Sequence, residues 1–218
     1  MIDFYTWTTP NGRKVSIMLE ELGLPYTTHA INIGEGEQMA PDFLKIAPNN
    51  KIPAIVDNDN GMTLMESGAI LMYLAEKTGK FLPTDADARW HTIEWLMLQM
   101  GGPGPFLGLE DETTRVGGPN RVFKYNKGKS AYAEERYLTE ARRLYGVLDR
   151  RLADHEYIVD DYSIADIAVW PWISRFDWQT LNLNDYPNVK RWYLDIAARP
   201  AVQTGFHIPK KVQEIPMP

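Results

Sequence analysis

The sequence predicts a small α/β domain followed by an all-helical domain. Over the first 80 of the 218 residues, short apolar runs alternate with helical patterns. From Trp90 onward, apolar residues recur at helical spacing almost to the end of the chain. The polar stretch FLPTDADAR lies between the two patterns. We therefore expect domains over residues 1–80 and 87–210, with a C-terminal tail over 211–218.

The first domain is predicted to have the element order βαβαββα. The apolar run IDFYT ends at a Pro-Asn-Gly turn, and Val15, Met18, Leu19 and Leu22 then follow at helical spacing until Gly23. The other strands are expected over 26–33, 54–56 and 62–65, and the other helices over 41–46 and 66–79.

The second domain is predicted to be helical throughout. Residues 131–152 have the apolar spacing of one long amphipathic helix. A capping box of Ser163 with Asp166 begins another helix, and we expect Asp166 to be structural. The prolines of GGPGPFLG, residues 101–108, interrupt a straight helix because proline has no backbone N–H. Residues 206–218 hold three prolines and no periodicity, which predicts an extended tail.

Composition excludes several classes of chemistry. The net charge is -6, and no basic segment favours nucleic acid or an anionic membrane. The chain has no cysteine, so it has no thiol nucleophile and any thiol chemistry needs sulfur from another molecule. The four histidines lack metal-ligand spacing, and we expect no metal site. Without a signal-peptide pattern or a long apolar run, a cytoplasmic location is expected.

Two neighbouring segments suggest a binding site for a short peptide. In NNKIPAIVD, Pro53 stands at the start of a strand, where a cis Ile52–Pro53 bond would leave the Ile52 backbone N–H and C=O facing outward. Such a pair can bind an added peptide strand. Glu66 and Ser67 follow where a strand gives way to a helix, and a helix N-terminus favours a carboxylate. A short peptide with a free carboxylate fits both features.

Four motifs in register resemble the cytosolic glutathione transferase superfamily. They are FYTWTTPNGRKV, NNKIPAIV, ESGAILMYLAEK and YSIADIAVWPW, and the resemblance extends over residues 1–210. It implies a thioredoxin-like N-terminal domain, a helical-bundle C-terminal domain, glutathione as co-substrate and a homodimer. The TTPNG loop and the GGPGP segment are similar to those of the bacterial Nu class.

The resemblance also assigns roles to individual residues. It makes Pro53 the cis-proline and puts the Ile52 backbone on the cysteinyl part of glutathione. It puts Glu66 and Ser67 on the γ-glutamyl end, with two further residues beside that site, Asn50 and Lys51.

The TTPNG loop differs from the better-known classes, which place Tyr, Ser or Cys at the end of the first strand. The Nu-like pattern has Thr9 and Asn11 instead. Both can donate a hydrogen bond to a thiolate, and such a donor lowers a thiol pKa. The alternative is that Thr9 only caps a helix.

Arg136 matches a basic residue that the Nu-like pattern sends to the ligand, and a guanidinium suits a carboxylate. The alternative is an exposed ion pair with Glu134 or Glu135. We expect a glutathione-dependent disulfide reductase or peroxidase with weak conjugation of electrophiles. An ordinary glutathione transferase, an isomerase and a non-catalytic glutathione-binding module remain alternatives.

Overall fold

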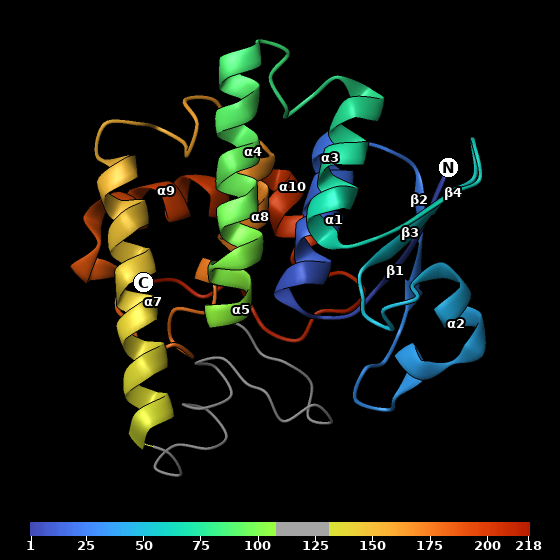
Figure 1. Ribbon diagram of the computed structural model, residues 1–218, viewed down its shortest axis with the longest axis horizontal. Coiled ribbons are helices and arrows are strands. Elements are labelled where there is room, and N and C mark those ends of the chain that lie inside the picture. Colours follow the sequence, from blue (N-terminus) through green and yellow to red (C-terminus); the bar gives the residue numbers. More distant parts are fainter. Residues whose placement is uncertain (108–130) are drawn as a thin grey trace. The chain divides into compact units, whose positions relative to one another are not determined.

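The computed structural model describes residues 1–107 and 131–218, and it divides into two units (Figure 1). The first unit comprises Met1–Leu82 with Ala197–Ile215, and the second comprises Pro83–Ile196 with Pro216–Pro218. None of the helices in the described part of the chain is both long enough and apolar enough to cross a membrane.

A four-stranded mixed sheet forms the centre of the first unit, in the order β2-β1-β3-β4. The strands are β1 (Ile2–Thr6), β2 (Tyr26–Ala30), β3 (Ala54–Asp57) and β4 (Met62–Met65). β1 pairs in parallel with β2 and antiparallel with β3, and β3 pairs antiparallel with β4. The C-terminal end of β1 therefore lies at the same edge of the sheet as the N-terminal end of β3.

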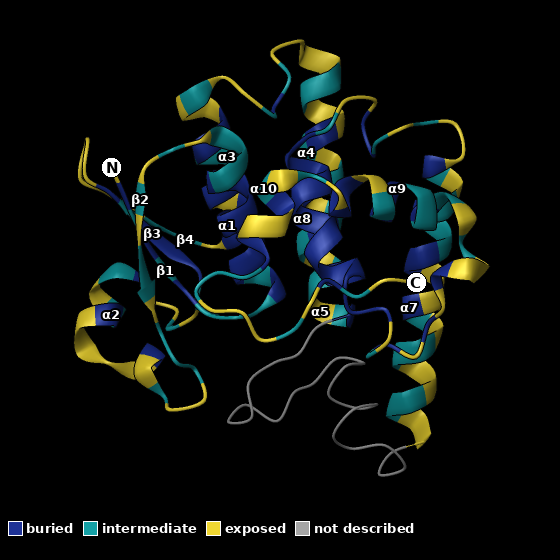
Figure 2. Ribbon diagram, turned by 180° about the vertical axis from the view of Figure 1, so that it is seen from behind, coloured by how far each residue is buried: buried dark blue, intermediate teal, exposed yellow. Residues whose placement is uncertain are grey.

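Helices cover both faces of this sheet. They are α1 (Pro10–Leu22), the short η1 (Glu37–Met39), α2 (Pro41–Ile46), α3 (Ser67–Thr78) and α10 (Pro200–Gly205). Figures 1 and 2 show α2 on the opposite side of the sheet from α1 and α3. Phe43 and Ala47 of α2 form a core cluster with Ala54 of β3. The predicted order βαβαββα is confirmed, although the second strand ends at Ala30 and α1 begins at Pro10.

The structure differs from the expectation that the helical domain runs to residue 210 and is followed by a separate tail over 211–218. It groups Ala197–Ile215 with the first unit. The reason is that α10 packs against α1, with Gly205 lying against Ile17. A Cβ added at Gly205 would lie 2.8 Å from Ile17 Cα, so a larger residue would separate the two helices.

Polar contacts fix the same C-terminal segment to α1. Arg199 makes a two-pronged ion pair with Glu21 at 2.6 and 3.0 Å. Arg13 donates from Nε to the Phe206 carbonyl at 3.1 Å, and its guanidinium lies 3.6 Å from the centre of the Phe206 ring. The end of the chain is extended as expected, but Phe206 and Ile215 are buried.

The second unit is helical. Its elements are α4 (Ala86–Gly101), α5 (Pro103–Leu107), α7 (Ala131–Leu152), α8 (Ile164–Ile173), η2 (Leu183–Asp185) and α9 (Pro187–Ala197). The helix predicted over 131–152 is confirmed, as is the break between α4 and α5. Every residue of α8 is buried, as Figure 2 shows, and α8 packs against α4.

Asp166 closes the capping box of α8, as predicted. Its carboxylate accepts hydrogen bonds from the Ser163 N–H and hydroxyl, the Ile158 N–H and the Trp192 indole. Burial nevertheless raises its pKa to about 6. These contacts join three segments of the helical unit, so the role of Asp166 is structural.

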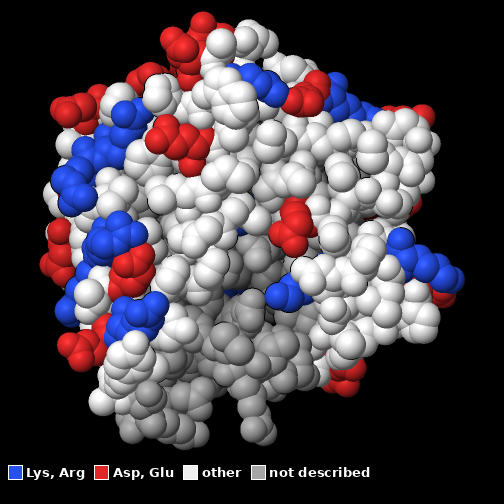
Figure 3. Space-filling model, viewed as in Figure 1, with Lys and Arg blue, Asp and Glu red and all other residues white. Residues whose placement is uncertain are grey.

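The charges over α7 are of both signs. Figure 3 shows basic and acidic side chains next to one another in the region that α7 occupies in Figure 1. Arg143 makes a two-pronged ion pair with Glu140 there, at 2.8 and 2.7 Å. Mixed charges do not create the single-sign field that would attract a polyanion.

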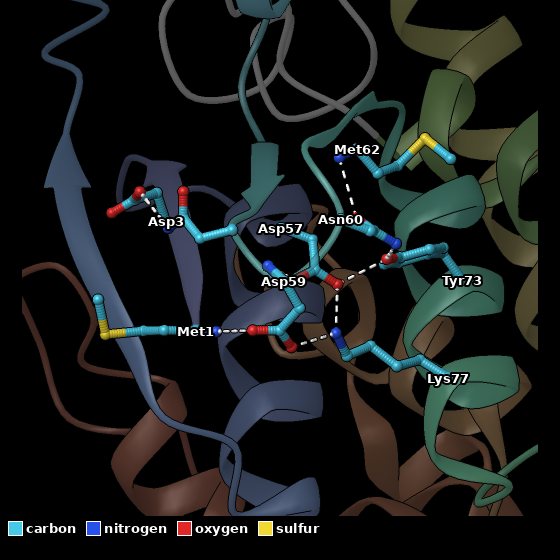
Figure 4. Close-up of polar contacts among 9 residues, drawn as sticks. Met1, Asp3, Asp57, Asp59, Asn60, Met62, Tyr73 and Lys77 are labelled. Atoms are coloured by element: carbon cyan, nitrogen blue, oxygen red, sulfur yellow. Dashed lines mark hydrogen bonds and ion pairs between the residues drawn. The ribbon is translucent and has the colours of Figure 1, made fainter.

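A charged cluster lies at the N-terminal end of β1, in the turn between β3 and β4 (Figure 4). Asp57 is fully buried and accepts hydrogen bonds from Tyr73 at 2.6 Å and from Lys77 at 2.5 Å. Lys77 also donates to Asp59, which pairs with the Met1 amine, each at 2.6 Å. These contacts lower the pKa of both carboxyls, that of Asp59 to about 2.

Candidate active site

Thr9 occupies the N-cap of α1, directly after β1. Its Oγ1 accepts a hydrogen bond from the Gly12 N–H at 3.1 Å, and its own N–H donates to the Trp7 carbonyl at 2.7 Å. In residues 1–107 and 131–218, no acceptor is found for the Thr9 hydroxyl hydrogen. Thr9 therefore caps α1, as the alternative interpretation predicted. Its hydroxyl can still donate a hydrogen bond to another group.

Gly12 allows this tight loop to form. A Cβ at position 12 would lie 2.4 Å from both Thr6 Oγ1 and the Trp7 carbonyl oxygen. Asn11 belongs to the first turn of α1, because the helix begins at Pro10 and includes the predicted Pro-Asn-Gly turn. Thr9 and Asn11 thus lie together at a helix N-terminus, where the dipole stabilises an anion.

The Ile52–Pro53 peptide bond is cis, as expected. Pro53 is buried, and the Ile52 side chain packs on the core cluster formed by α2 and β3. The Ile52 backbone N–H and C=O make no hydrogen bond within the described part of the chain. This backbone pair can bind an extended peptide, as an exposed strand edge does.

Glu66 and Ser67 lie at the start of α3. Glu66 has φ 69° and ψ 112°, a backbone conformation that costs free energy for any residue except glycine. Its carboxylate accepts a hydrogen bond from the Asn49 side chain at 3.5 Å. Ser67, the first residue of α3, is buried, and the helix N-terminus behind it favours a carboxylate ligand.

Asn50 and Lys51 are close to Ile52 in the chain, but the structure assigns the contact with Glu66 to Asn49. Asn50 has φ 46°, and its side chain approaches the Met39 sulfur at 2.7 Å. Lys51 is exposed. The sequence analysis did not single out Asn49. An Asn-Asn pair is typical of a turn, in which one Asn takes the left-handed backbone conformation and the other can direct its side chain elsewhere.

Lys14 was also missed. It is fully buried on α1, and its Nζ donates to Ser67 Oγ at 3.2 Å. Burial lowers its pKa to about 7, and the charge of Glu66 opposes this shift. Lys14 precedes Met18 by four residues, and this spacing places it on the apolar face of α1. That signal was available in the sequence.

Arg136 lies on α7 in the helical unit, where it lines a cavity of about 570 Å³. Phe106 and Tyr132 supply the aromatic wall of this cavity. Arg136 makes no ion pair with a described residue, in contrast to Arg143 with Glu140. The expected alternative, an ion pair with Glu134 or Glu135, is therefore absent from the described part of the chain.

Family comparisons agree with this geometry. Residues 8–77 match the glutathione S-transferase N-terminal domain, and residues 105–200 match the C-terminal domain. The chain belongs to the glutathione S-transferase family. The first unit is accordingly the thioredoxin-like domain of a glutathione S-transferase, and the second is its helical domain.

Two Escherichia coli members of the family are similar along most of the chain. The disulfide-bond oxidoreductase YfcG is 46% identical over 208 residues, with 92% of each chain covered. The disulfide-bond oxidoreductase YghU is 40% identical over 220 residues, with 94% of this chain and 73% of YghU covered.

Solved structures of glutathione transferases are similar as well. The enzyme from Burkholderia graminis, with two glutathione molecules bound per subunit, has a TM-score of 0.87 and 42% identity, covering 97% of this chain and 89% of its own. The enzyme from Pseudomonas putida, with one glutathione disulfide bound per subunit, has a TM-score of 0.85 and 40% identity, covering 95% and 91%.

Proposed function

We propose that this chain is a glutathione-dependent disulfide oxidoreductase with weak conjugating activity toward electrophiles. The observation on which this rests is the Thr9 hydroxyl, which can donate at a helix N-terminus in a chain that has no cysteine. The catalytic thiolate then comes from glutathione. The similar proteins named disulfide-bond oxidoreductases, and those crystallised with two glutathiones or with glutathione disulfide, support the same reaction.

The proposed reaction is two successive thiol–disulfide exchanges. A glutathione thiolate attacks one sulfur of a disulfide RSSR, the S–S bond breaks, and RS⁻ leaves and is protonated. A second glutathione then attacks the mixed disulfide. The sum is two glutathiones and RSSR giving glutathione disulfide and two RSH. Exchange is fastest when the attacking thiol has a pKa near the ambient pH, which moderate stabilisation by neutral donors provides.

The residue roles belong to the same proposal. Thr9 and Asn11 donate to the glutathione sulfur, and the Ile52 backbone pairs with the cysteinyl part, next to Pro53. Glu66 binds the γ-glutamyl ammonium group and Ser67 the γ-glutamyl carboxylate, with Asn50 and Lys51 at the margin.

We further propose that Arg136 binds a carboxylate of the second ligand. Its place in the wall of a cavity, without an ion-pair partner among the described residues, supports this role. A guanidinium can hold a carboxylate through two parallel hydrogen bonds.

A non-catalytic regulatory module is the second candidate. The transcriptional regulator URE2 of Saccharomyces cerevisiae is 32% identical over 237 residues, with 89% of this chain and 64% of the regulator covered. A regulator that binds glutathione without turnover would keep the γ-glutamyl site and need no donor for the sulfur. Turnover therefore separates the two candidates.

The test compares a small mixed disulfide with an aromatic halide, each supplied with glutathione under the same conditions. Glutathione-dependent reduction of the disulfide, well above halide conjugation, is the expected result. Strong conjugation with negligible disulfide reduction would instead indicate an ordinary glutathione transferase, and an isomerase would turn over neither substrate. Glutathione binding without any turnover would indicate the regulatory module.

A homodimer in the cytoplasm completes the proposal. The family resemblance supports the dimer, and the composition supports the location. Light scattering on the purified chain would give twice the chain mass if the dimer forms, and cell fractionation tests the location.

A further inference from the structure

Residues 207–214 of the first unit lie beside the loop that follows β1. The Lys210 ammonium lies 4.4 Å from the centre of the Trp7 ring. Trp7 is half-buried and comes directly after β1, and its carbonyl accepts a hydrogen bond from the Thr9 N–H at 2.7 Å. Because consecutive Cα atoms are about 3.8 Å apart, the Cα atoms of Trp7 and Thr9 are at most about 7.6 Å apart. The segment therefore places a cation next to the proposed site of the glutathione sulfur.

The adjacent Lys211 has a different partner. Both lysines are exposed, but Lys211 makes an ion pair with the exposed Glu214 of the same segment. Lys210 has no carboxylate within ion-pair distance in the described part of the chain, and its contact is the face of the Trp7 ring. A cation over an indole ring keeps its charge and its N–H donors, since the ring attracts it only through a quadrupole. Lys210 can therefore bind an anion while Trp7 holds its ammonium group in place.

The other basic groups near this segment have structural contacts or carry little charge. Arg13 donates to the Phe206 carbonyl and stacks its guanidinium on the Phe206 ring. Burial lowers the pKa of His207, so its ring is largely neutral at pH 7. Among the described residues of this segment, Lys210 is thus the cation that a ligand at the TTPNG loop can use.

We propose that Lys210 is a specificity-determining residue that binds a carboxylate of the disulfide substrate. This inference rests on the proposed function, because it needs a disulfide at the TTPNG loop. A disulfide attacked beside Thr9 carries its substituents a few atoms beyond the reacting sulfur, and Trp7 and Lys210 are a few residues' width away from Thr9. Coulomb attraction by the ammonium favours an anionic substituent there and disfavours a cationic one. The chain should therefore reduce disulfides that carry carboxylates in preference to neutral and cationic disulfides.

The proposal assigns Lys210 to the second substrate and not to glutathione itself. In the proposed function, the γ-glutamyl carboxylate of glutathione binds at Ser67 on α3, and its cysteinyl backbone pairs with Ile52. Lys210 lies instead over the residue that leads into the Thr9 loop, on which the sulfur is placed. Binding of glutathione should therefore not depend on Lys210.

Steady-state kinetics with three disulfides of similar size tests this selectivity. They are dithiodipropionate, its neutral diamide and the cationic disulfide cystamine, each with saturating glutathione, and the formation of glutathione disulfide is measured. In Lys210→Gln, the ratio of kcat/KM for dithiodipropionate to kcat/KM for the diamide should fall about three- to fivefold, as expected for the loss of one exposed ion pair. The ratio of cystamine to the diamide should rise. Intrinsic reactivity cancels, because the same disulfides are compared between proteins.

Three further variants isolate the charge of Lys210 and its contact with Trp7. Lys211→Gln removes an equal charge one residue away, and it should keep the wild-type ratio because Lys211 is paired with Glu214. Lys210→Arg keeps the charge and can still stack on the ring, so it should also keep the wild-type ratio. In a Trp7→Leu background the ammonium loses its support, so Lys210→Gln should change the ratio less than it does in the wild type.

Equal changes of the ratio in Lys210→Gln and Lys211→Gln would overturn the inference, because they would indicate a general effect of net charge. Weaker binding of S-hexylglutathione to Lys210→Gln in calorimetry would also overturn it, since Lys210 would then bind glutathione. The same calorimetry shows whether each variant is folded, and if Trp7→Leu is not, the lysine variants still decide. Failure of the wild type to reduce any of the three disulfides would overturn the proposed function along with this inference. Reduction with the same ratio in wild type and Lys210→Gln would overturn the inference alone.

Discussion

The two ends of the central sheet differ in whether their polar groups have partners within the unit. At the N-terminal end of β1, the buried Asp57 has Tyr73 and Lys77 as partners, and Asp59 has Lys77 and the Met1 amine (Figure 4). At the C-terminal end of β1, two polar groups have no internal partner within the described part of the chain. The Thr9 hydroxyl hydrogen has no acceptor there, and the Ile52 backbone N–H and C=O make no hydrogen bond.

The same strands and the same helix, α3, contribute to both ends, so the difference does not come from the fold. It comes from whether each polar group finds its partner within the unit. Groups with internal partners stabilise the native state, and groups that await a ligand lower its stability until the ligand binds. The two ends should therefore respond in opposite ways to substitution.

The largest expected effect is at Lys14 and depends on pH. Its pKa is about 7 in the folded chain and 10.5 when exposed, so between these values the unfolded state binds more protons. The stability of the wild type should therefore rise with pH across this range relative to Lys14→Met, and below pH 7 the variant should be the more stable by several kcal/mol. Urea denaturation at pH 6.5 and pH 9.5, without glutathione, measures both values.

Two stability curves that run parallel from pH 6.5 to pH 9.5 would mean that burial does not lower the pKa of Lys14 in the free protein. That result would remove the contrast between the two ends of the sheet. A conservative reference is Lys45→Met, since Lys45 is exposed and pairs only with the exposed Asp42.

At the opposite end, Asp57→Ala should destabilise the fold and leave glutathione binding unchanged. The substitution removes the acceptor for Tyr73 and Lys77, and a loss of about 1–3 kcal/mol is expected for such hydrogen bonds. Because the pKa of Asp57 is lowered, this stabilisation is present above the ordinary carboxyl pKa and disappears as the pH falls through the lowered value. Denaturation at pH 7 and pH 3 measures it.

Glutathione affinity is the control for Asp57→Ala. A change in affinity comparable to that of Glu66→Ala would show that the two ends are coupled through α3. The division between a stabilising end and a binding end would then be wrong.

Substitutions of Thr9, at the C-terminal end of β1, are tested by the rate of disulfide reduction. If Thr9 donates to the glutathione thiolate as proposed, Thr9→Ala removes this hydrogen bond, and a loss of about 10- to 100-fold in kcat is expected. It also removes the helix cap, with a cost of about 1 kcal/mol in stability. Thr9→Ser keeps the hydroxyl and should restore both. If Thr9→Ala raised KM and left kcat unchanged, the hydroxyl would bind glutathione without acting on its sulfur.

Local patterns predicted much of this molecule. Turn residues and periodicity gave the element order of the first unit, the helix over 131–152 and the capping box at Ser163 and Asp166, because each depends on neighbours within a few residues. Pro53 was expected to be cis from its place at the start of a strand, and the structure agrees.

Contacts between distant segments were not predictable in the same way. Arg13 and Phe206 are 193 residues apart, so nothing local indicates that the end of the chain packs on α1. Lys14 lies on the apolar face of a helix, yet it donates a hydrogen bond to Ser67, 53 residues further along. Asn49, and not Asn50, contacts Glu66, and this depends on the left-handed backbone conformation of Asn50. The TTPNG motif predicted a functional loop at Thr9 and Asn11, but the hydrogen bond by which Thr9 caps α1 is seen only in the structure.

The smallest expected effect compares two substitutions of Glu66. Its backbone has φ 69° and ψ 112°, which glycine adopts readily and other residues do not. Glu66→Gly should therefore gain about 1 kcal/mol in stability while it loses affinity for glutathione. Glu66→Ala should lose the same affinity without the gain, because alanine keeps the unfavourable backbone.

Comparing these two variants separates the effect of the backbone conformation on stability from the effect of the carboxylate on binding. Thermal or urea denaturation gives the stability difference, and calorimetry with S-hexylglutathione gives the affinity of each. At the Glu66 end of the sheet, a substitution that relaxes the backbone should weaken glutathione binding, whereas at the Asp57 end a substitution should lower stability and leave binding unchanged. If Glu66→Gly were no more stable than Glu66→Ala, the backbone conformation at residue 66 would carry no cost in stability.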